Sequence, residues 1–301
     1  MPRRIINDVF IVILVGGKGK RLKPLSTDSR PKAFLSITRD RKTMFKRTVE
    51  RAQEIAPIEN IVVVANSRHI DLVKNDMPDI ERRNLILEPI SKNTAPAITL
   101  AASVLKKLSG EIVIVVLPSD QYIADEMDKE EYLDSIKTGI DFVKDAREAI
   151  LTLGIRPKFP STEFGYIRIR GQGASVKGIY KVEKFVEKPD LETAKKYIEN
   201  GKYLWNTGTF IFKVSSILKA VKKFAPKIYN ILSRFYDINE AYDKLPDISI
   251  DYAVMEKANN IYCIEGSYRW QDIGSFENLK SILKQESRDF VLEDGKIARI
   301  L

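Results

Sequence analysis

Glycines and basic side chains directly follow the first apolar run of the chain, which covers residues 9–15. Glycine lets a backbone turn sharply at the end of a strand and bring its N–H groups close to an anion. The spacing matches neither the P-loop nor G-x-G-x-x-G, because Leu22 stands where the last glycine would be. The loop is either a basic surface turn or a phosphate site of another kind, and Arg21 and Lys32 favour the phosphate site. It reads Gly16-Gly17-Lys18-Gly19-Lys20-Arg21.

The composition excludes several kinds of chemistry. The chain has 301 residues, with 50 Lys or Arg and 41 Asp or Glu, so its formal net charge is +9. The single cysteine, Cys263, excludes a disulfide framework, and the single histidine, His69, excludes a His-pair metal site and argues against a Ser-His-Asp mechanism. The positive charge indicates either a well-solvated surface or a phosphate-rich partner. Its spread along the chain favours a small phosphorylated ligand over nucleic acid.

We expect no targeting segment and no membrane segment. The apolar run 9–15 is short and is followed by glycines and basic residues rather than by a cleavage pattern. No stretch approaches the ~20 apolar residues that span a bilayer. The sequence therefore predicts a soluble, cytoplasmic protein without a membrane or nucleic-acid partner.

Strand-like and helix-like stretches alternate in the first half of the chain. This alternation predicts βαβ units and a mostly parallel sheet, which binds ligands beyond the carboxyl ends of its strands. The loops after residues 15, 87 and 117 are therefore expected along one edge of one sheet. The expected strands are 9–15, 61–65, 85–87 and 112–117, and the main helices are 44–55, 95–108 and 132–143.

The pattern changes near residue 150, where strand-like runs become more frequent. No linker rich in serine or glycine separates the halves, so we expect one catalytic domain over 1–286 with lobes at 1–149 and 150–286. Residues 287–301 are expected to form a short hairpin with Asp294-Gly295 at its turn. The expected strands are 150–154, 166–170, 180–186, 204–212 and 261–264, and the helices are 191–199, 215–224, 226–235 and 276–284.

The glycine loop, together with Pro31-Lys32, resembles the signature of sugar-1-phosphate nucleotidyltransferases (nucleotide-sugar pyrophosphorylases). Further motifs follow in the family's order as far as residue 275 and resemble its mannose-1-phosphate guanylyltransferase (GDP-mannose pyrophosphorylase) branch. The resemblance implies an α/β fold with a Rossmann-like, mostly parallel mixed sheet flanked by helices, and an α+β sugar-binding lobe. The motifs are Glu88-Pro89, Asn93-Thr94-Ala95-Pro96-Ala97-Ile98, Leu117-Pro118-Ser119-Asp120, Phe164-Gly165-Tyr166-Ile167, Phe185-Val186-Glu187-Lys188-Pro189, Trp205-Asn206-Thr207-Gly208, Ser249 to Lys257, and Trp270-Gln271-Asp272-Ile273-Gly274-Ser275.

The resemblance also implies a reaction. An oxygen of a sugar 1-phosphate attacks the α-phosphorus of a nucleoside triphosphate, and pyrophosphate leaves. In this branch GTP and mannose 1-phosphate give GDP-mannose and pyrophosphate, with Mg²⁺ as the cofactor. The nucleophile needs no general base, because the second pKa of a phosphate monoester is about 6. Catalysis would then depend on cations and alignment.

By the same resemblance, four residues form the catalytic set. Asp120 and Asp272 hold one Mg²⁺ that bridges the nucleotide and the sugar phosphate. Arg21 neutralises the β- and γ-phosphates, and Lys32 lies near the α-phosphate. One or two carboxylates suit Mg²⁺, which completes its octahedron with phosphate oxygens and water. A single loop aspartate is otherwise typical of turns and helix caps.

The resemblance assigns the remaining site residues to the two substrates. Glu187 and Lys188 are adjacent, so both reach one ligand only where the strand ends, and Pro189 supplies that end. A simple salt bridge between them is the alternative. Thr94 is expected to cap a helix. Asp251 either caps the helical stretch 249–257 or touches the site, and the structural role is favoured. The sugar phosphate is assigned to Gly165, Glu187, Lys188 and Asn206, and the nucleotide to Gly16, Gly17, Gly19, Arg21, Glu88, Pro89, Asn93 and Ser119.

Three alternatives remain open. Another sugar or base is one, because Gln121 stands where the family usually has histidine. A regulatory subunit that binds nucleotide sugars without making them would be expected to lack a catalytic residue, and all four are present. Nucleic-acid binding has only the net charge in its favour. A homodimer is compatible with a sheet enzyme of this size.

Overall fold

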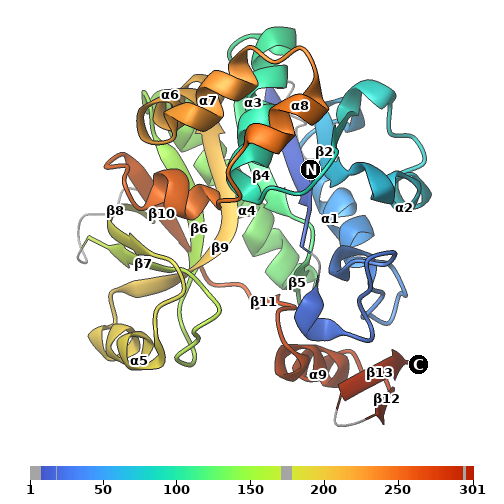
Figure 1. Cartoon of the computed structure of the whole chain (residues 1–301). Helices are drawn as coiled ribbons and strands as arrows, with labels where there is room; N and C mark the ends of the chain where they lie inside the picture. Colours follow the sequence, from blue (N-terminus) through green and yellow to red (C-terminus); the bar gives the residue numbers. More distant parts are fainter. Residues whose placement is uncertain (1–7, 18, 171–177, 294–295) are drawn as a thin grey trace.

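The structure, a computed structural model, describes residues 8–17, 19–170, 178–293 and 296–301. A mixed nine-stranded sheet runs through the molecule in the order β3-β2-β1-β4-β9-β6-β10-β8-β7 (Figure 1). Its strands are β1 (Val9–Val15), β2 (Ile61–Asn66), β3 (Leu85–Glu88), β4 (Val113–Pro118), β6 (Ile150–Ile155), β7 (Tyr166–Ile169), β8 (Ile179–Val186), β9 (Tyr203–Lys213) and β10 (Ile261–Gly266).

Helices cover both faces of this sheet (Figure 1). Ile11 and Ile13 of β1 pack in the core with α1 and α4, whereas Val12 packs in the core with α3 and α6. Successive strand residues point to opposite faces, so an unbroken apolar run is stable only where both faces are covered. The expected α/β fold with a mixed sheet is confirmed. The helices are α1 (Met44–Gln53), α2 (Ile70–Asp76), α3 (Thr94–Ser109), α4 (Glu126–Asp145), α5 (Leu191–Asn200), α6 (Val214–Phe224), α7 (Pro226–Ser233), α8 (Ile238–Lys244) and α9 (Phe276–Gln285).

The direction of strand pairing differs between the two halves. β1 is parallel to β2 and β4, and β2 is parallel to β3. Among the described strands of the second half, β9 is antiparallel to β4, β6 and β7, and β6 and β10 pair in parallel. Because parallel strands end at one edge of a sheet, the loops after β1, β3 and β4 lie at the same edge.

A second, two-stranded sheet was not predicted from the sequence. β5 (Gln121–Ile123) and β11 (Trp270–Asp272) pair antiparallel, with Asp272 opposite Gln121. Asp120 directly precedes β5, so this pairing brings the two aspartates together from distant parts of the chain. Each strand has only three residues, which is too short for hydrophobic periodicity to reveal.

The C-terminal elements pack beneath the loop that follows β1 (Figure 1). β12 (Phe290–Glu293) and β13 (Lys296–Ile300) form a hairpin where the sequence predicted one, and Asp294-Gly295 at its expected turn lies outside the described residues. A third apolar core joins this hairpin and α9 to Leu22 and Ile37. The segment between Arg21 and Lys32 therefore rests on the last part of the chain.

One local expectation needs correction, and one helix was missed. Asn93, not Thr94, is the N-cap of α3, and its Oδ1 accepts a hydrogen bond from the Thr94 N–H at 2.9 Å. The Thr94 hydroxyl instead accepts a bond from the Ile250 N–H at 2.8 Å. The helix α8 was also not predicted. No helix in the described part of the chain is both long and apolar enough to cross a membrane.

Candidate active site

A lysine between two aspartates forms the centre of the candidate site. Asp120 follows β4, Asp272 ends β11, and Lys32 begins a short 3-10 turn at Lys32–Phe34. The Lys32 Nζ lies 2.8 Å from Asp120 Oδ2 and 2.9 Å from Asp272 Oδ1. The structure thus brings together three of the four residues predicted to be catalytic.

Lys32 and the two aspartates stabilise one another's charged forms. Burial alone would lower the pKa of Lys32, but Asp120 and Asp272 outweigh it and hold that pKa above its ordinary value. Burial raises the pKa of Asp120, Lys32 opposes that shift, and Asp272 adds to it. Two carboxylates this close need a cation between them, because like charges at short range disfavour ionisation. In this structure the Lys32 ammonium supplies it.

The loop after β1 has the conformation that glycine permits. Gly17 and Gly19 have φ values of 95° and 54°. A Cβ at Gly19 would lie 2.7 Å from the Ser26 Oγ, so another residue would collide there as well as being strained. Ser26 in turn donates a hydrogen bond to the Gly19 carbonyl at 2.5 Å. The glycine loop and the segment leading to Lys32 are therefore tied together.

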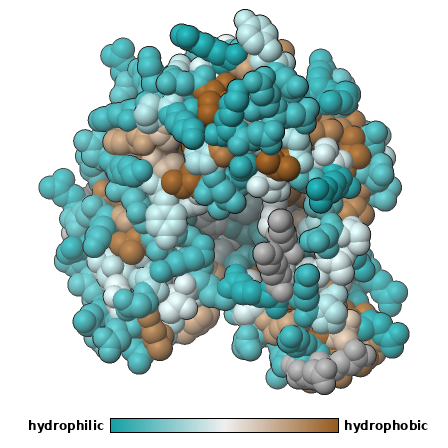
Figure 2. All heavy atoms as spheres, in the orientation of Figure 1, coloured by the Kyte–Doolittle hydropathy of each residue, from teal (hydrophilic) through white to brown (hydrophobic). Residues whose placement is uncertain are grey.

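Arg21 pairs with an acidic residue that was not predicted to belong to the site. Its guanidinium donates to the carboxylate of Glu163, which lies in the second half of the chain. The Arg21 side chain is 57% exposed. It lies close to Gly274, where a Cβ would be only 3.2 Å from the Arg21 Nη2, so the glycine leaves room for the guanidinium. The Arg21–Glu163 ion pair thus connects the two halves, between which Figure 2 shows the molecule hollowed and mostly hydrophilic.

The residues predicted for the sugar converge at the end of β8. This strand ends at Val186, so Glu187 and Lys188 lie outside it and form an ion pair at 2.5 Å. A Cβ at Gly165 would lie 2.6 Å from the Glu187 Oε2 and 3.4 Å from the Asn206 Cβ. Gly165 therefore leaves room for the Glu187 carboxylate beside Asn206. All four predicted residues are close together.

Asp251 belongs to the same group, and the prediction that it caps a helix is wrong. It begins a short π-helix, Asp251–Met255, that has no side-chain cap. Its Oδ1 accepts a hydrogen bond from the Asn206 Nδ2 at 3.1 Å. Burial, followed by the nearby charge of Glu187, raises the pKa of Asp251 to about 7, against opposing contributions that include Lys188. The sequence contained the aspartate, but not the fold that places it beside Asn206.

Replacing Asp251 with asparagine is expected to change how stability depends on pH. A carboxyl with a raised pKa keeps its proton in the native state, while the unfolded chain loses it near pH 4. Wild-type stability therefore falls as the pH rises from about 4 to about 7, whereas an asparagine side chain at this position has no proton to lose. Urea unfolding should show the variant gaining about 2–3 kcal/mol on wild type at pH 8 relative to pH 5. Equal differences at both pH values would contradict this, and exposed Asp243→Asn is the control.

The residues predicted for the nucleotide are placed less uniformly. Ser119 donates from its hydroxyl to the Leu14 carbonyl at 2.8 Å, which ties the loop after β4 to the end of β1. Asn93 is exposed at the start of α3. The Glu88 carboxylate, however, is buried and accepts a bond from the Tyr242 hydroxyl at 3.0 Å. Burial raises the pKa of Glu88 to about 7, opposed by that hydrogen bond. Glu88 thus faces the α3 and α8 side of the sheet.

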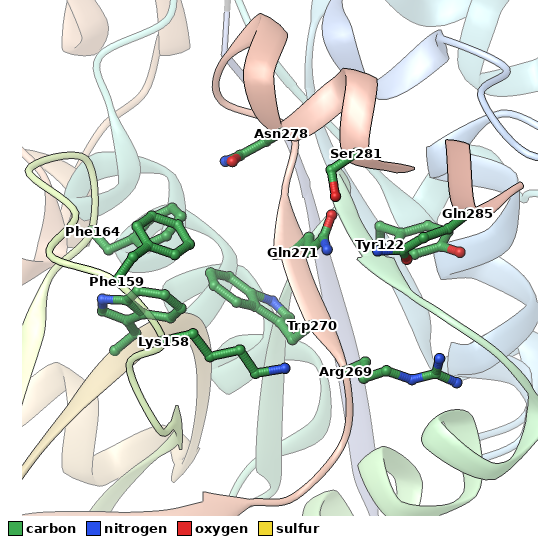
Figure 3. Close-up of a pocket in the computed structure, with 11 residues that line it drawn as sticks. Tyr122, Lys158, Phe159, Phe164, Arg269, Trp270, Gln271, Asn278, Ser281 and Gln285 are labelled. Atoms are coloured by element: carbon green, nitrogen blue, oxygen red, sulfur yellow. The ribbon is translucent and has the colours of Figure 1, made fainter. Parts of the chain in front are cut away.

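An aromatic cleft of about 160 Å³ lies beside β11 (Figure 3). The rings of Phe159, Trp205, Phe164 and Trp270 meet edge to face along it, with centroids 4.8, 5.0 and 5.3 Å apart. Polar groups from β11 and α9, including Gln271, form the opposite wall. None of these residues was predicted for the site.

The cleft supports the candidate site from behind. Phe164, Trp205 and Gln271 directly precede Gly165, Asn206 and Asp272, respectively. Trp205 and Asn206 are neighbours in β9 and point to opposite faces, so Trp205 serves the aromatic cleft and Asn206 the candidate site. A change in the packing of the Trp205 ring would therefore shift Asn206.

The chain belongs to the nucleotidyl transferase family, whose model matches residues 11–288. It is 36% identical over 297 residues to the mannose-1-phosphate guanylyltransferase RfbM of Salmonella typhimurium, covering 94% of this chain and 60% of that one. With the mannose-1-phosphate guanylyltransferase of Escherichia coli K12 it shares 35% identity over 294 residues, with 92% and 60% covered. The chain spans about 60% of the length of these curated relatives.

A solved structure resembles the whole fold. A Thermus thermophilus protein described as a mannose-1-phosphate geranyltransferase has a TM-score of 0.83 and 32% identity to this chain. The match covers 95% of this chain and 83% of that one. Both the family and the α/β fold predicted from the sequence are thereby confirmed.

Proposed function

We propose that this chain transfers GMP from GTP to mannose 1-phosphate, giving GDP-mannose and pyrophosphate. The observation that carries the proposal is the Lys32 ammonium held between Asp120 and Asp272 at 2.8 and 2.9 Å, at the sheet edge where the glycine loop ends. The curated relatives named as mannose-1-phosphate guanylyltransferases support this choice of substrates.

The reaction needs charge neutralisation and alignment more than proton transfer. The sugar phosphate is already dianionic near neutral pH, since its second pKa is about 6. The obstacle is repulsion between this nucleophile and the triphosphate, which cations placed in advance can reduce. We assign Arg21 to the β- and γ-phosphates and Lys32 to the α-phosphate.

Asp120 and Asp272 fit a divalent cation. They already bind a cation at short range, and Mg²⁺ commonly takes one or two protein carboxylates together with phosphates and water. No cluster of three or more metal-binding side chains occurs among the residues that the structure describes, so these two would be its protein ligands. When bound, Mg²⁺ would offset the negative charge of the phosphates.

The second half of the chain is proposed to bind the sugar. Glu187 and Asn206 offer hydrogen-bonding groups for hydroxyls beside Gly165, and Lys188 is placed for the sugar phosphate. In this proposal residues 1–149 form the nucleotide lobe and residues 150–286 the sugar lobe. Asp251 orients Asn206 through their hydrogen bond of 3.1 Å.

A substrate panel tests the proposal. Pyrophosphate release is measured with each of four nucleoside triphosphates and with mannose 1-phosphate or glucose 1-phosphate, with and without Mg²⁺. We expect turnover with GTP and mannose 1-phosphate, and none after chelation of the metal. Turnover with another pair would overturn the substrates but keep the reaction class. Absence of turnover in folded protein that binds GDP-mannose would indicate a regulatory subunit instead.

Replacing Glu163 with glutamine is expected to strengthen nucleotide binding modestly. Glu163 competes with phosphates for the Arg21 guanidinium, and this pair is partly exposed. Exposed ion pairs contribute about 1 kcal/mol or less, so KM for the triphosphate should fall about two- to fivefold. Glu192→Gln, an exposed residue in α5, is the matched control. A higher KM in Glu163→Gln would show that Glu163 orients Arg21 rather than competing for it.

A further inference from the structure

A basic groove, separate from the candidate active site, lies between the C-terminal hairpin and the segment that leads from Arg21 to Lys32. Its volume is about 540 Å³, which is within the range typical of sites for small ligands. No residue of the candidate active site lines it. Four arginines do, and they come from both sides of the groove: Arg30, Arg41, Arg288 and Arg299.

Among the residues that the structure describes, no Asp or Glu side chain pairs with these arginines. No aspartate or glutamate is among the described residues that line the groove. The Arg30 guanidinium donates to the Phe34 carbonyl at 3.4 Å. Arg288 donates to the Thr38 carbonyl at 2.7 Å and to the main-chain oxygen of Leu301 at 2.6 Å. Arg41 and Arg299 are exposed, and within the described part of the chain neither forms an ion pair. In the described part of the chain, three guanidinium groups at the groove, those of Arg30, Arg41 and Arg299, therefore have no ion-pair partner, whereas Arg288 binds main-chain oxygens.

Several arginines elsewhere in the protein do have acidic partners. Arg156 pairs with Glu265, and Arg269 pairs with Asp128, although both arginines are about half exposed. Cations gathered around one groove repel one another, so an anion that enters the groove reduces that repulsion as well as forming new bonds. Four arginines around one groove, with no Asp or Glu among its described lining residues, thus point to an anionic ligand.

The shape and lining of the groove narrow the class of anion. A guanidinium presents a planar fork that binds a phosphate group through two parallel hydrogen bonds. Arginines on two opposing walls suit a ligand with more than one phosphate. Leu25, Leu35 and Ile300 also line the groove, and apolar surroundings strengthen such charged contacts.

We propose that this groove is a second anion site, which binds a small molecule carrying a diphosphate or longer phosphate chain. Free pyrophosphate and a nucleoside diphosphate share this chemistry. One wall includes Pro24, Leu25, Thr27 and Arg30, which lie between Arg21 and Lys32. An anion bound here orders the segment that positions both of these cations.

Calorimetric titration of the metal-free protein with inorganic tripolyphosphate at low salt tests the site. The double variant Arg41→Ala/Arg299→Ala should weaken binding about tenfold or more, because two charge-assisted contacts are lost. Arg147→Ala/Arg234→Ala removes the same net charge from exposed positions outside the groove and should retain wild-type affinity. Arg21→Ala should retain this binding as well, which separates the groove from the candidate active site.

Each other outcome contradicts the proposal. Equal weakening in both double variants would mean that only net charge matters, and loss of all binding in Arg21→Ala would place it in the active site. Amide hydrogen exchange of residues 24–36 gives a second readout, since tripolyphosphate should slow it in wild type but not in Arg41→Ala/Arg299→Ala. Repeating the titration with pyrophosphate and with GDP distinguishes the two ligand sources. None of these measurements depends on the proposed transferase activity.

Discussion

Replacing Asp120 with asparagine is expected to abolish nucleotidyl transfer, with kcat/KM falling by about 10³-fold or more. The change keeps the size of the side chain but removes a negative charge 2.8 Å from the Lys32 Nζ. A divalent cation would lose one of its two carboxylates, and Lys32 would be held by Asp272 alone at 2.9 Å. The measurement is the initial rate of pyrophosphate release at saturating Mg²⁺, with the substrate pair that the panel identifies.

The behaviour of related variants tests the reason for this loss. Asp272→Asn should be as inactive as Asp120→Asn, and the double variant should be little worse, because residues that act as one unit are not additive. Asp243→Asn, an exposed change on α8, should keep the wild-type rate. An Asp120→Asn enzyme that retains more than about one tenth of the activity would exclude Asp120 from the metal site.

The strands that form the framework of the site were predictable because burial on both faces leaves a plain pattern. β1 and β4 are continuous apolar runs, and both ends of β1 were predicted correctly. The position of Asp120 after β4 followed from that pattern alone. The order of the strands within the mixed sheet did not, since antiparallel pairing of β9 with β4 depends on the whole fold.

The contacts that complete the site could not be predicted from local patterns. Lys32 and Asp272 are separated by 240 positions, and Arg21 and Glu163 by 142. Asp251 looked like a cap because a polar residue near the start of a helical stretch usually is one. Only the fold brings it to Asn206, which donates a hydrogen bond to it, and near the charge of Glu187, which raises its pKa.

For Glu88 the position along the chain was predicted, but the direction of its side chain was not. Its position at the end of β3 places it at the ligand edge of the sheet, in agreement with the motif. Strand alternation, however, turns the side chain toward α3 and α8, where Tyr242 binds it. The sequence identified the edge correctly, whereas the direction of the side chain depends on a partner that is 154 positions away.

Replacing Lys32 with methionine is expected to have opposite effects on activity and on metal affinity. Activity should fall about 10²- to 10³-fold, because a cation near the reacting phosphate is lost. Affinity for Mn²⁺ without nucleotide should rise about tenfold or more, because in the wild type the metal must displace an ammonium that both aspartates already bind. Electron paramagnetic resonance of free Mn²⁺ during titration measures this affinity directly.

Activity is expected to fall while metal affinity rises, and a general disturbance of the fold would not produce both changes. A variant that merely disturbs the fold would bind metal more weakly, and unchanged affinity would show that Lys32 and the metal occupy separate positions. Removing the ammonium leaves Asp120 and Asp272 facing each other, so added Mn²⁺ should raise the Tm of Lys32→Met more than that of wild type. Exposed Lys227→Met is the control for loss of charge. Tighter metal binding with lower activity would mean that the Lys32 ammonium occupies the metal position in the free protein. When a metal binds there, the ammonium would move toward the phosphates.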